Sequence, residues 1–137
     1  MSKFTLGRGN TGVSLPKPNL SSTSSYTIAT WVYPVWPSSA TAATQYMTIW
    51  GYNAKHRLRV SNSGVLLSQL GGNFFSAGKL TSGAWHQVLF VYDASKATES
   101  YYIDGKFDKS ASLSNAAAAF TSAYYLDNTD GARASTR

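Results

Sequence analysis

Hydrophobic and polar residues alternate along most of this chain, a pattern that predicts β-strands with one buried face. Over residues 26–33 the alternation places Tyr26, Ile28, Thr30 and Val32 on one face. Pro34 follows closely, and a proline cannot donate the hydrogen bond that a neighbouring strand needs. This strand is therefore predicted to end at the proline.

Further strands are predicted over residues 46–50, 56–60, 65–70 and 85–92. A tight turn is expected at residues 62–64, and the glycines within residues 71–73 interrupt the chain again. The run at 85–92 is apolar on both faces, which predicts a strand in the middle of its sheet, covered on both sides. Asp104 and Gly105 lie between two strand-like runs and favour a type I′ hairpin, whose two central residues need positive φ.

Many short strands with turn signals between them, and no convincing helix, predict an all-β fold: an antiparallel two-sheet sandwich. Residues 115–120 could form one helical turn, but so short a run is marginal on its own. A length of 137 residues fits a single domain over residues 1–137. Within it, residues 127–137 are expected to form an extended C-terminal tail.

The composition supports β-structure and excludes several kinds of site. Aromatic residues make up 14% of the chain and charged residues only 13%, a balance that favours half-buried pleated surfaces. The chain has no cysteine, which excludes disulfides, thiolate metal sites and a cysteine nucleophile. No leader and no apolar run of membrane-spanning length is visible. The net charge of +6 comes from scattered residues, so it indicates solubility with a mild preference for anionic partners, and neither nucleic acid nor a membrane is expected as a partner.

Four motifs follow one another in order: an opening strand pair at 4–16, Y-T-I-A-T-W-V-Y-P at 26–34, L-T-S-G-A-W-H-Q-V at 80–88 and Y-I-D-G-K at 102–106. Together they resemble the laminin-G-like members of the concanavalin A-like lectin/glucanase jelly-roll superfamily, over residues from about 4 to 109. The resemblance implies a single laminin-G-like domain of two stacked, curved antiparallel sheets. In that superfamily the concave face or the rim loops often hold ligands.

The C-terminal end departs from the family pattern. Residues 124–126 resemble the strand written L-x-I-G in the family, but residues 127–137 contain no counterpart of the F-x-G-x-I-D-x-V strand that follows it. That final strand closes the sandwich against the N-terminal strand. We therefore expect a jelly roll that lacks the family's final strand, with an open edge that either a smaller sheet or a neighbouring chain explains.

Catalysis is not expected. Glycosidases of the superfamily need two positioned carboxyl groups, and their E-x-D-x-x-E strand needs two glutamates, whereas this chain has only Glu99. A serine hydrolase would need His56 or His86 as its base, and no G-x-S-x-G elbow is present. We interpret His86 as a structural hydrogen-bonding residue and His56 as a surface residue. Asp104 is explained by its turn.

Two sets of residues are candidates for ligand contact. Asp127, Asn128 and Asp130 form an oxygen-rich group of the kind that Ca²⁺ prefers, although Asp and Asn before glycine are also ordinary turn residues. No other cofactor is expected. The candidates for binding a sugar or a partner are aromatic residues that loops or strand ends could expose, with Phe74 and Phe75 in a flexible loop, and two arginines of the tail: Trp36, Trp50, Tyr52, Phe74, Phe75, Arg133 and Arg137. The alternative is that most of these aromatic residues pack the core or cover a sheet face.

Two functions from different classes remain. The sequence favours a non-enzymatic structural or interaction protein, namely a phage capsid decoration protein at the virion surface. Such a protein would bind other subunits of an oligomeric assembly or capsid through its sheet edges and termini. The alternative is an extracellular, lectin-like carbohydrate-binding module, which the resemblance implies, although a fold does not specify a function. The two can coexist, since a module on a virion surface can also bind glycans.

Overall fold

The computed structural model describes residues 13–16, 18–21, 23–35, 46–53, 56–70, 72–113 and 124–126. In these ranges the chain forms β-strands and no helix, so no helix there could cross a membrane. The strands are β1 (Val13–Leu15), β2 (Tyr26–Val32), β3 (Tyr46–Asn53), β4 (His56–Ser61), β5 (Val65–Gln69), β6 (Asn73–Lys79), β7 (His86–Asp93), β8 (Thr98–Ile103), β9 (Lys106–Ser112) and β10 (Tyr124–Leu126).

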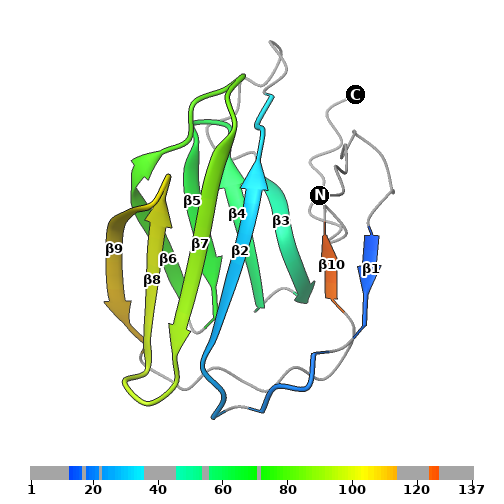
Figure 1. Cartoon of the computed structure of the whole chain (residues 1–137), viewed down its shortest axis with the longest axis vertical. Coiled ribbons are helices and arrows are strands. Elements are labelled where there is room, and N and C mark those ends of the chain that lie inside the picture. Colours follow the sequence, from blue (N-terminus) through cyan, green and yellow to red (C-terminus); the bar gives the residue numbers. More distant parts are fainter. Residues whose placement is uncertain are drawn as a thin grey trace.

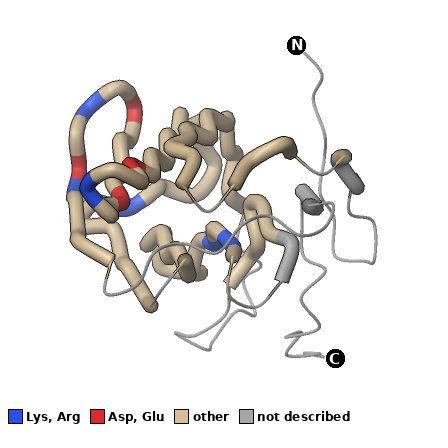
Figure 2. The backbone as a smooth tube through the Cα atoms, turned by 90° about the horizontal axis from the view of Figure 1, so that it is seen from below, with Lys and Arg blue, Asp and Glu red and all other residues tan. Residues whose placement is uncertain are grey.

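The strands form two sheets that stack face to face. One sheet has six strands in the order β1-β10-β3-β4-β5-β6, and the other has four in the order β2-β7-β8-β9. Every pairing is antiparallel. Figure 1 shows the four-stranded sheet in front of the six-stranded one, and Figure 2, seen along the strands, shows the two layers. The all-β, antiparallel two-sheet sandwich predicted from the sequence is confirmed.

The core between the sheets consists of alternate residues from both of them. On β7 these are Val88, Phe90 and Tyr92, which are buried and face the six-stranded sheet. Trp50 of β3 contacts Phe90 across the interface, with ring centroids 6.0 Å apart. The main core residues are Ile49, Trp50, Leu58, Val60, Leu66, Leu70, Phe74, Leu80, Val88, Phe90, Tyr92 and Tyr101.

Strands β2 and β7 follow the predicted alternation. In β2 partly buried and exposed residues alternate over its whole length, and its register with β7 runs from Tyr26 opposite Tyr92 to Val32 opposite His86. β7 has a neighbour on each side, β2 and β8, so its predicted place inside the sheet is confirmed. The prediction that both of its faces are covered is wrong. The outward residues Leu89 and Val91 are only partly buried, because no second layer lies over that face within the described residues.

The predicted hairpin at Asp104 and Gly105 is also confirmed. Their φ angles are 51° and 76°, the two positive values that a type I′ turn requires. This turn joins β8 to β9 and brings Asp104 beside the first residues of β7, where Gln87 lies. The hairpin therefore positions a carboxylate at one end of the four-stranded sheet.

The C-terminal strand β10 lies between β1 and β3. Val13 is opposite Leu126, and Leu126 is opposite Trp50. The last described strand thus does close against the N-terminal one, as Figure 1 shows at the side of the six-stranded sheet. The expected tail at 127–137, the expected absence of a final strand there and the helical turn at 115–120 all lie outside the described residues.

Two predictions about single segments are wrong. Phe74 and Phe75 belong to strand β6, not to a flexible loop, because β6 pairs along β5 as the last strand of the six-stranded sheet. His56 is buried, not a surface residue: it begins β4, whose inward positions continue with Leu58 and Val60. Arg57 and Arg59, which alternate with these inward residues, take the outward positions of β4.

Asp108 joins the two sheets where their last strands meet. Its carboxylate on β9 accepts hydrogen bonds from the backbone N–H groups of Ala77 and Gly78 on β6, at 2.8 and 2.6 Å. β6 and β9 are the end strands of their sheets, and unpaired N–H groups of an end strand invite pairing with other chains. The Asp108 bridge satisfies two of these groups within the molecule.

Glu99 is buried between the sheets. The Ser68 hydroxyl donates a hydrogen bond to Glu99 Oε2 at 2.6 Å, so the pair links β5 to β8. Burial raises the pKa of Glu99 to about 7, because the charged form loses its hydration, and the hydrogen bond from Ser68 opposes only part of that effect. Glu99 is an interior residue of the sandwich.

Candidate functional site

Three large aromatic side chains stand exposed together on the outer face of the four-stranded sheet. Trp31 of β2 is 49% exposed, Tyr33 just beyond β2 is 46% exposed, and Trp85 just before β7 is 50% exposed. Because successive side chains of a strand point to opposite faces, inward Val32 leaves Trp31 and Tyr33 pointing outward. The rings of Tyr33 and Trp85 are in contact, with centroids 5.4 Å apart and tilted by 56°. We call these three residues the aromatic platform.

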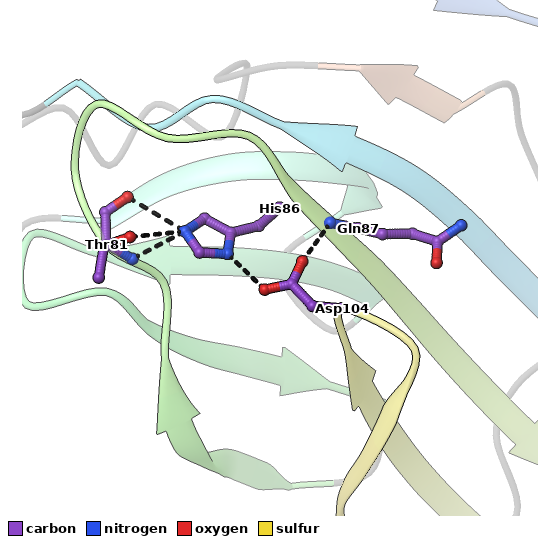
Figure 3. Close-up of polar contacts among 4 residues, drawn as sticks. All are labelled: Thr81, His86, Gln87 and Asp104. Carbon is purple, nitrogen blue, oxygen red and sulfur yellow. Dashed lines mark hydrogen bonds and ion pairs between the residues drawn. The ribbon is translucent and has the colours of Figure 1, made fainter.

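A hydrogen-bond network of Thr81, His86, Gln87 and Asp104 includes the two residues that follow Trp85 in the chain (Figure 3). The imidazole of His86, directly after Trp85, is bonded through Nδ1 to Asp104 Oδ2 at 2.8 Å and through Nε2 to the Thr81 hydroxyl at 2.9 Å. The backbone N–H of Thr81 also points at Nε2, at 3.0 Å, so Nε2 accepts and Nδ1 carries the proton that is donated to Asp104. His86 therefore has the structural role predicted from the sequence.

Asp104 offers a charged, exposed acceptor beside the platform. Its Oδ1 accepts the backbone N–H of Gln87 at 2.9 Å, and Gln87 is opposite Trp31 in the β2–β7 register. The hydrogen bond from His86, assisted by that from Gln87, holds the pKa of Asp104 below its usual range. The carboxylate is therefore ionised at neutral pH, and about half of its side chain is open to solvent.

The loop that carries Thr81 is tied to the end of β2. The N–H of Gly83 donates to the carbonyl of buried Pro34 at 2.8 Å, and Gly83 has a φ of 76°, which favours glycine at this position. The contact fixes the loop that leads into Trp85 against the residue that follows Tyr33. Two segments about fifty residues apart thus hold the platform in one arrangement.

Beyond the platform, a row of apolar side chains crosses the same outer face. A row runs across the four strands from Ala29 through Leu89 and Tyr102 to Phe107. The rings of Tyr102 and Phe107 meet edge to face, with centroids 5.6 Å apart, and Phe107 is largely exposed. This face can stack against flat apolar surfaces and accept hydrogen bonds at one end.

The candidate contact residues from the sequence are distributed differently. Trp50 and Phe74 are only 1% and 6% exposed, so the expectation that loops or strand ends expose them is wrong. Phe74 instead stacks on Tyr101 in the core, with centroids 4.7 Å apart. Phe75 is exposed, on the outer face of the six-stranded sheet. Tyr52 lies on β3, but its side chain is not part of the described structure. The remaining candidates lie outside the described residues: Trp36, Arg133, Arg137, Asp127, Asn128 and Asp130.

Sequence reasoning missed the platform itself. The alternation that placed Tyr26, Ile28, Thr30 and Val32 on one face also assigned Trp31 and Tyr33 to the other, and that second face was the informative one. Trp85 was read as part of a motif and not as a surface residue. The two-residue alternation of β2 was the signal that could have placed Trp31 and Tyr33 on the outer face.

The carboxylates in the described part of the chain have structural partners. Asp93 binds Ser95 and Lys96 in a turn, Glu99 binds Ser68 in the core, and Asp108 binds the backbone of β6. Only Asp104 lies beside the platform. Among the described residues no group of three or more His, Cys, Asp or Glu side chains could hold a metal ion.

Comparison with known proteins identifies the family. The model of the concanavalin A-like lectin/glucanases superfamily matches residues 7–136. Among solved structures the chain is similar to domain 4 of AbnA, a GH43 extracellular arabinanase from Geobacillus stearothermophilus, in complex with arabinotriose. The two are 20% identical with a TM-score of 0.58 over 84% of this chain and 56% of that chain, a likeness that shows the fold alone. No curated protein matches. The chain belongs to the concanavalin A-like lectin/glucanases superfamily, as its four motifs indicated.

Proposed function

We propose that this chain is a non-catalytic carbohydrate-binding module and that the aromatic platform, with Asp104 at its edge, binds a neutral saccharide. One observation carries the proposal: Trp31, Tyr33 and Trp85 are about half exposed on one face, beside an ordered carboxylate. The faces of aromatic rings are electron-rich and attract the C–H groups of a sugar ring. The sugar hydroxyls around that ring can then donate hydrogen bonds to Asp104.

The structure favours a rigid site of this kind. The platform stands on a sheet, and the loop before Trp85 is fixed by Gly83 and by the bonds of Thr81 to His86. A site that is ordered before binding loses little conformational entropy when the ligand arrives. The fold neighbour, an arabinanase domain in complex with arabinotriose, supports a neutral oligosaccharide as the class of ligand and an extracellular location.

The arrangement of acids supports a non-catalytic role. Glycoside hydrolysis requires two carboxyl groups on opposite sides of one scissile bond. Beside the platform the described residues provide only Asp104, and its Oδ2 is engaged by His86. Glu99, the single glutamate, lies in the core and cannot reach a ligand on the outer face.

The experiment is retention of the whole chain on gels that contain neutral polysaccharides, arabinan among them, followed by calorimetry with an oligosaccharide of the retained kind. Trp85→Ala should weaken binding about 30-fold or more, since truncating an aromatic anchor at a binding surface typically removes about 2 kcal/mol or more. Phe107→Ala is the matched control, because Phe107 is an exposed ring of the same face outside the platform. The proposal fails if no neutral glycan is retained, or if both variants bind like the wild type.

A second candidate is the structural role favoured by the sequence. The comparisons give no support to a virion or capsid protein in particular. The apolar row of Leu89, Tyr102 and Phe107 nevertheless offers a surface on which another subunit could pack. Sedimentation of the wild type and of Phe107→Ser separates the two functions: a concentration-dependent assembly that the substitution abolishes would favour subunit contact over sugar binding.

A further inference from the structure

The carboxylate of Asp104 lies in one row with the aromatic platform across the four-stranded sheet. Trp31 of β2 is opposite Gln87 of β7 in the register. Gln87 is in turn bonded twice to Asp104: its carbonyl accepts the backbone N–H of Asp104 at 2.9 Å, and its own N–H donates to Oδ1 of Asp104 at the same distance. Two strand spacings separate the backbones of Trp31 and Asp104, about 10 Å, a span that a short oligosaccharide can cover.

The negative charge of Asp104 is not neutralised by the side chain that holds it. His86 donates from Nδ1 to Oδ2 of Asp104, while its Nε2 accepts the N–H of Thr81, so the imidazole is neutral (Figure 3). Asp104 forms no ion pair with a lysine or arginine of the described part of the chain. About half of its side chain is exposed, and each carboxylate oxygen can accept a further hydrogen bond.

The lysine nearest to Asp104 along the chain belongs to the other face of the sheet. Lys106 is opposite Ile103 of β8, and Ile103 is opposite Val88 of the core. Because side chains of a strand alternate between its two faces, this row points inward, away from the platform. The pKa of Asp104 is accordingly lowered most by the hydrogen bond from His86 and least by the charge of Lys106. A cation on the outer face therefore meets the carboxylate without a competing lysine on that face.

The rings of the platform attract a cation as well. The faces of tryptophan and tyrosine rings stabilise a ligand cation within about 6 Å, and tryptophan does so most strongly. A protonated amino group in place of a sugar hydroxyl thus gains from the rings and also forms a charge-assisted hydrogen bond with Asp104, which is stronger than that of a hydroxyl. The net charge of +6 opposes the approach of a cation, so such a preference has to arise at the site itself.

We propose that the platform prefers, over a neutral saccharide, an amino saccharide whose protonated amino group replaces the hydroxyl that faces Asp104. The sugar ring stacks on the aromatic rings, and the amino group donates to the Asp104 carboxylate. This inference rests on the proposed function, and it names the class of saccharide that the same site selects.

The test is calorimetry of the full chain with three tetrasaccharides of identical linkage that differ only at carbon 2 of each sugar. They are cellotetraose, with a hydroxyl, the chitin tetramer, with an acetamide, and the chitosan tetramer, with an amino group. At about pH 6 amino groups are protonated and Asp104 is ionised. The chitosan tetramer should bind about tenfold more tightly than the other two, because one neutral hydrogen bond becomes charge-assisted. Equal or weaker binding of the chitosan tetramer, or no binding of any of the three, would overturn the inference.

Three variants locate the preference. Asp104→Asn should reduce it to less than twofold. Asp93→Asn is the matched control, because it removes an equal charge at the far end of β7, and it should leave the preference unchanged. An equal effect of the two substitutions would show that overall charge sets the preference, which would overturn the site. Gln87→Lys places a cation beside Asp104 and keeps the backbone bonds, so it should also abolish the preference, and thermal unfolding excludes loss of fold in each variant.

Two further measurements separate this inference from the proposed function. Trp85→Ala should weaken the binding of neutral and amino tetramers alike, because every saccharide stacks on the platform. If neutral binding is lost in Trp85→Ala but the wild type shows no preference for the chitosan tetramer, the proposed function stands and this inference alone fails. A peptide of four lysines tests whether charge suffices: binding as tight as that of the chitosan tetramer would overturn the selection of a saccharide.

Discussion

The two outer faces of the sandwich are built by the same rule and carry different chemistry. The outward positions of β2, β7 and β8 hold aromatic and aliphatic side chains, hydroxyls, the amide of Gln87 and, at the end of β7, the carboxylate of Asp93, with no lysine or arginine among them. The outward positions of β4 hold Arg57 and Arg59, fixed by Gln69. Because the fold constrains only the inward half of each strand, the outward half is open to specialise. The side chains that are exposed for contact with a ligand therefore lie at the positions that contribute least to the core.

The largest expected effect concerns the interior that both faces share. Since burial raises the pKa of Glu99 from 4.5 to about 7, the folded protein holds this proton more tightly than the unfolded chain does. The contribution of Glu99 to the free energy of unfolding is therefore greatest below pH 4.5, falls as the pH rises towards 7, and is constant above that. The loss amounts to about 3 kcal/mol.

Denaturant unfolding of wild type and Glu99→Gln at pH 4.5 and pH 8 measures this effect. Glu99→Gln cannot lose a proton at this position, so its free energy of unfolding should not show the decrease expected for wild type. Its stability relative to wild type should therefore be higher at pH 8 than at pH 4.5. The affinity of the platform for a saccharide should not change at a pH where both proteins are folded, because Glu99 touches neither face. A parallel pH dependence of the two proteins would show that Glu99 is not protonated in the fold.

The second effect concerns the two ends of the outer face of the four-stranded sheet. Trp31→Ala combined with Trp85→Ala should lower the affinity for a neutral saccharide about 100-fold, because two aromatic anchors are lost. Phe107→Ala, which removes an exposed ring of the same face outside the platform, should leave that affinity unchanged. Calorimetry with the neutral saccharide on both variants gives the result, and an equal loss of affinity in the two variants would contradict a binding site confined to the platform.

A third effect concerns the bridge that holds the two sheets together. A Cβ at residue 78 would lie 2.7 Å from Oδ1 of Asp108, so Gly78→Ala must displace the carboxylate that bonds β6. We expect a loss of about 2 kcal/mol in the free energy of unfolding. Gly72→Ala is the matched control, since a Cβ there meets nothing within 4 Å, and it should be nearly neutral. Equal melting temperatures for the two variants would show that the bridge contributes nothing.

The smallest effect concerns salt. Raising the salt concentration screens exposed charges. Neutral binding at the platform depends on ring contacts, so it should change less than twofold between about 50 mM and about 500 mM NaCl. Titrations at both salt concentrations test this, and a several-fold loss of affinity would show that charge and not ring contact carries the binding.

Much of the fold followed from the sequence because strand alternation and turn residues act locally. The β2 alternation and the Asp104 turn were both predicted, and both hold. Phe74 and His56 were misplaced for a different reason. Their environment is made by distant partners: β5 and Tyr101 for Phe74, and the opposite sheet for the inward positions of β4. No local pattern states which strand will lie beside which.

The candidate site was harder to predict than the fold. An aromatic residue in a strand reads as a core residue, and Trp50 is one, whereas Trp31 and Trp85 are exposed. Because successive side chains of a strand point to opposite faces, a buried ring can be told from an exposed one only when one inward residue of the strand is known. The hydrogen bonds of Arg57 and Arg59 to Gln69 could not be predicted without the register between β4 and β5, since Gln69 is ten or more residues away from both arginines along the chain.

The most direct test of the account is an NMR titration of the whole chain with a neutral oligosaccharide, observing the indole N–H signals of its four tryptophans. The account predicts that the signals of Trp31 and Trp85 shift in step with saturation while that of buried Trp50 does not. Saturable binding that leaves the signals of Trp31 and Trp85 unperturbed would contradict it.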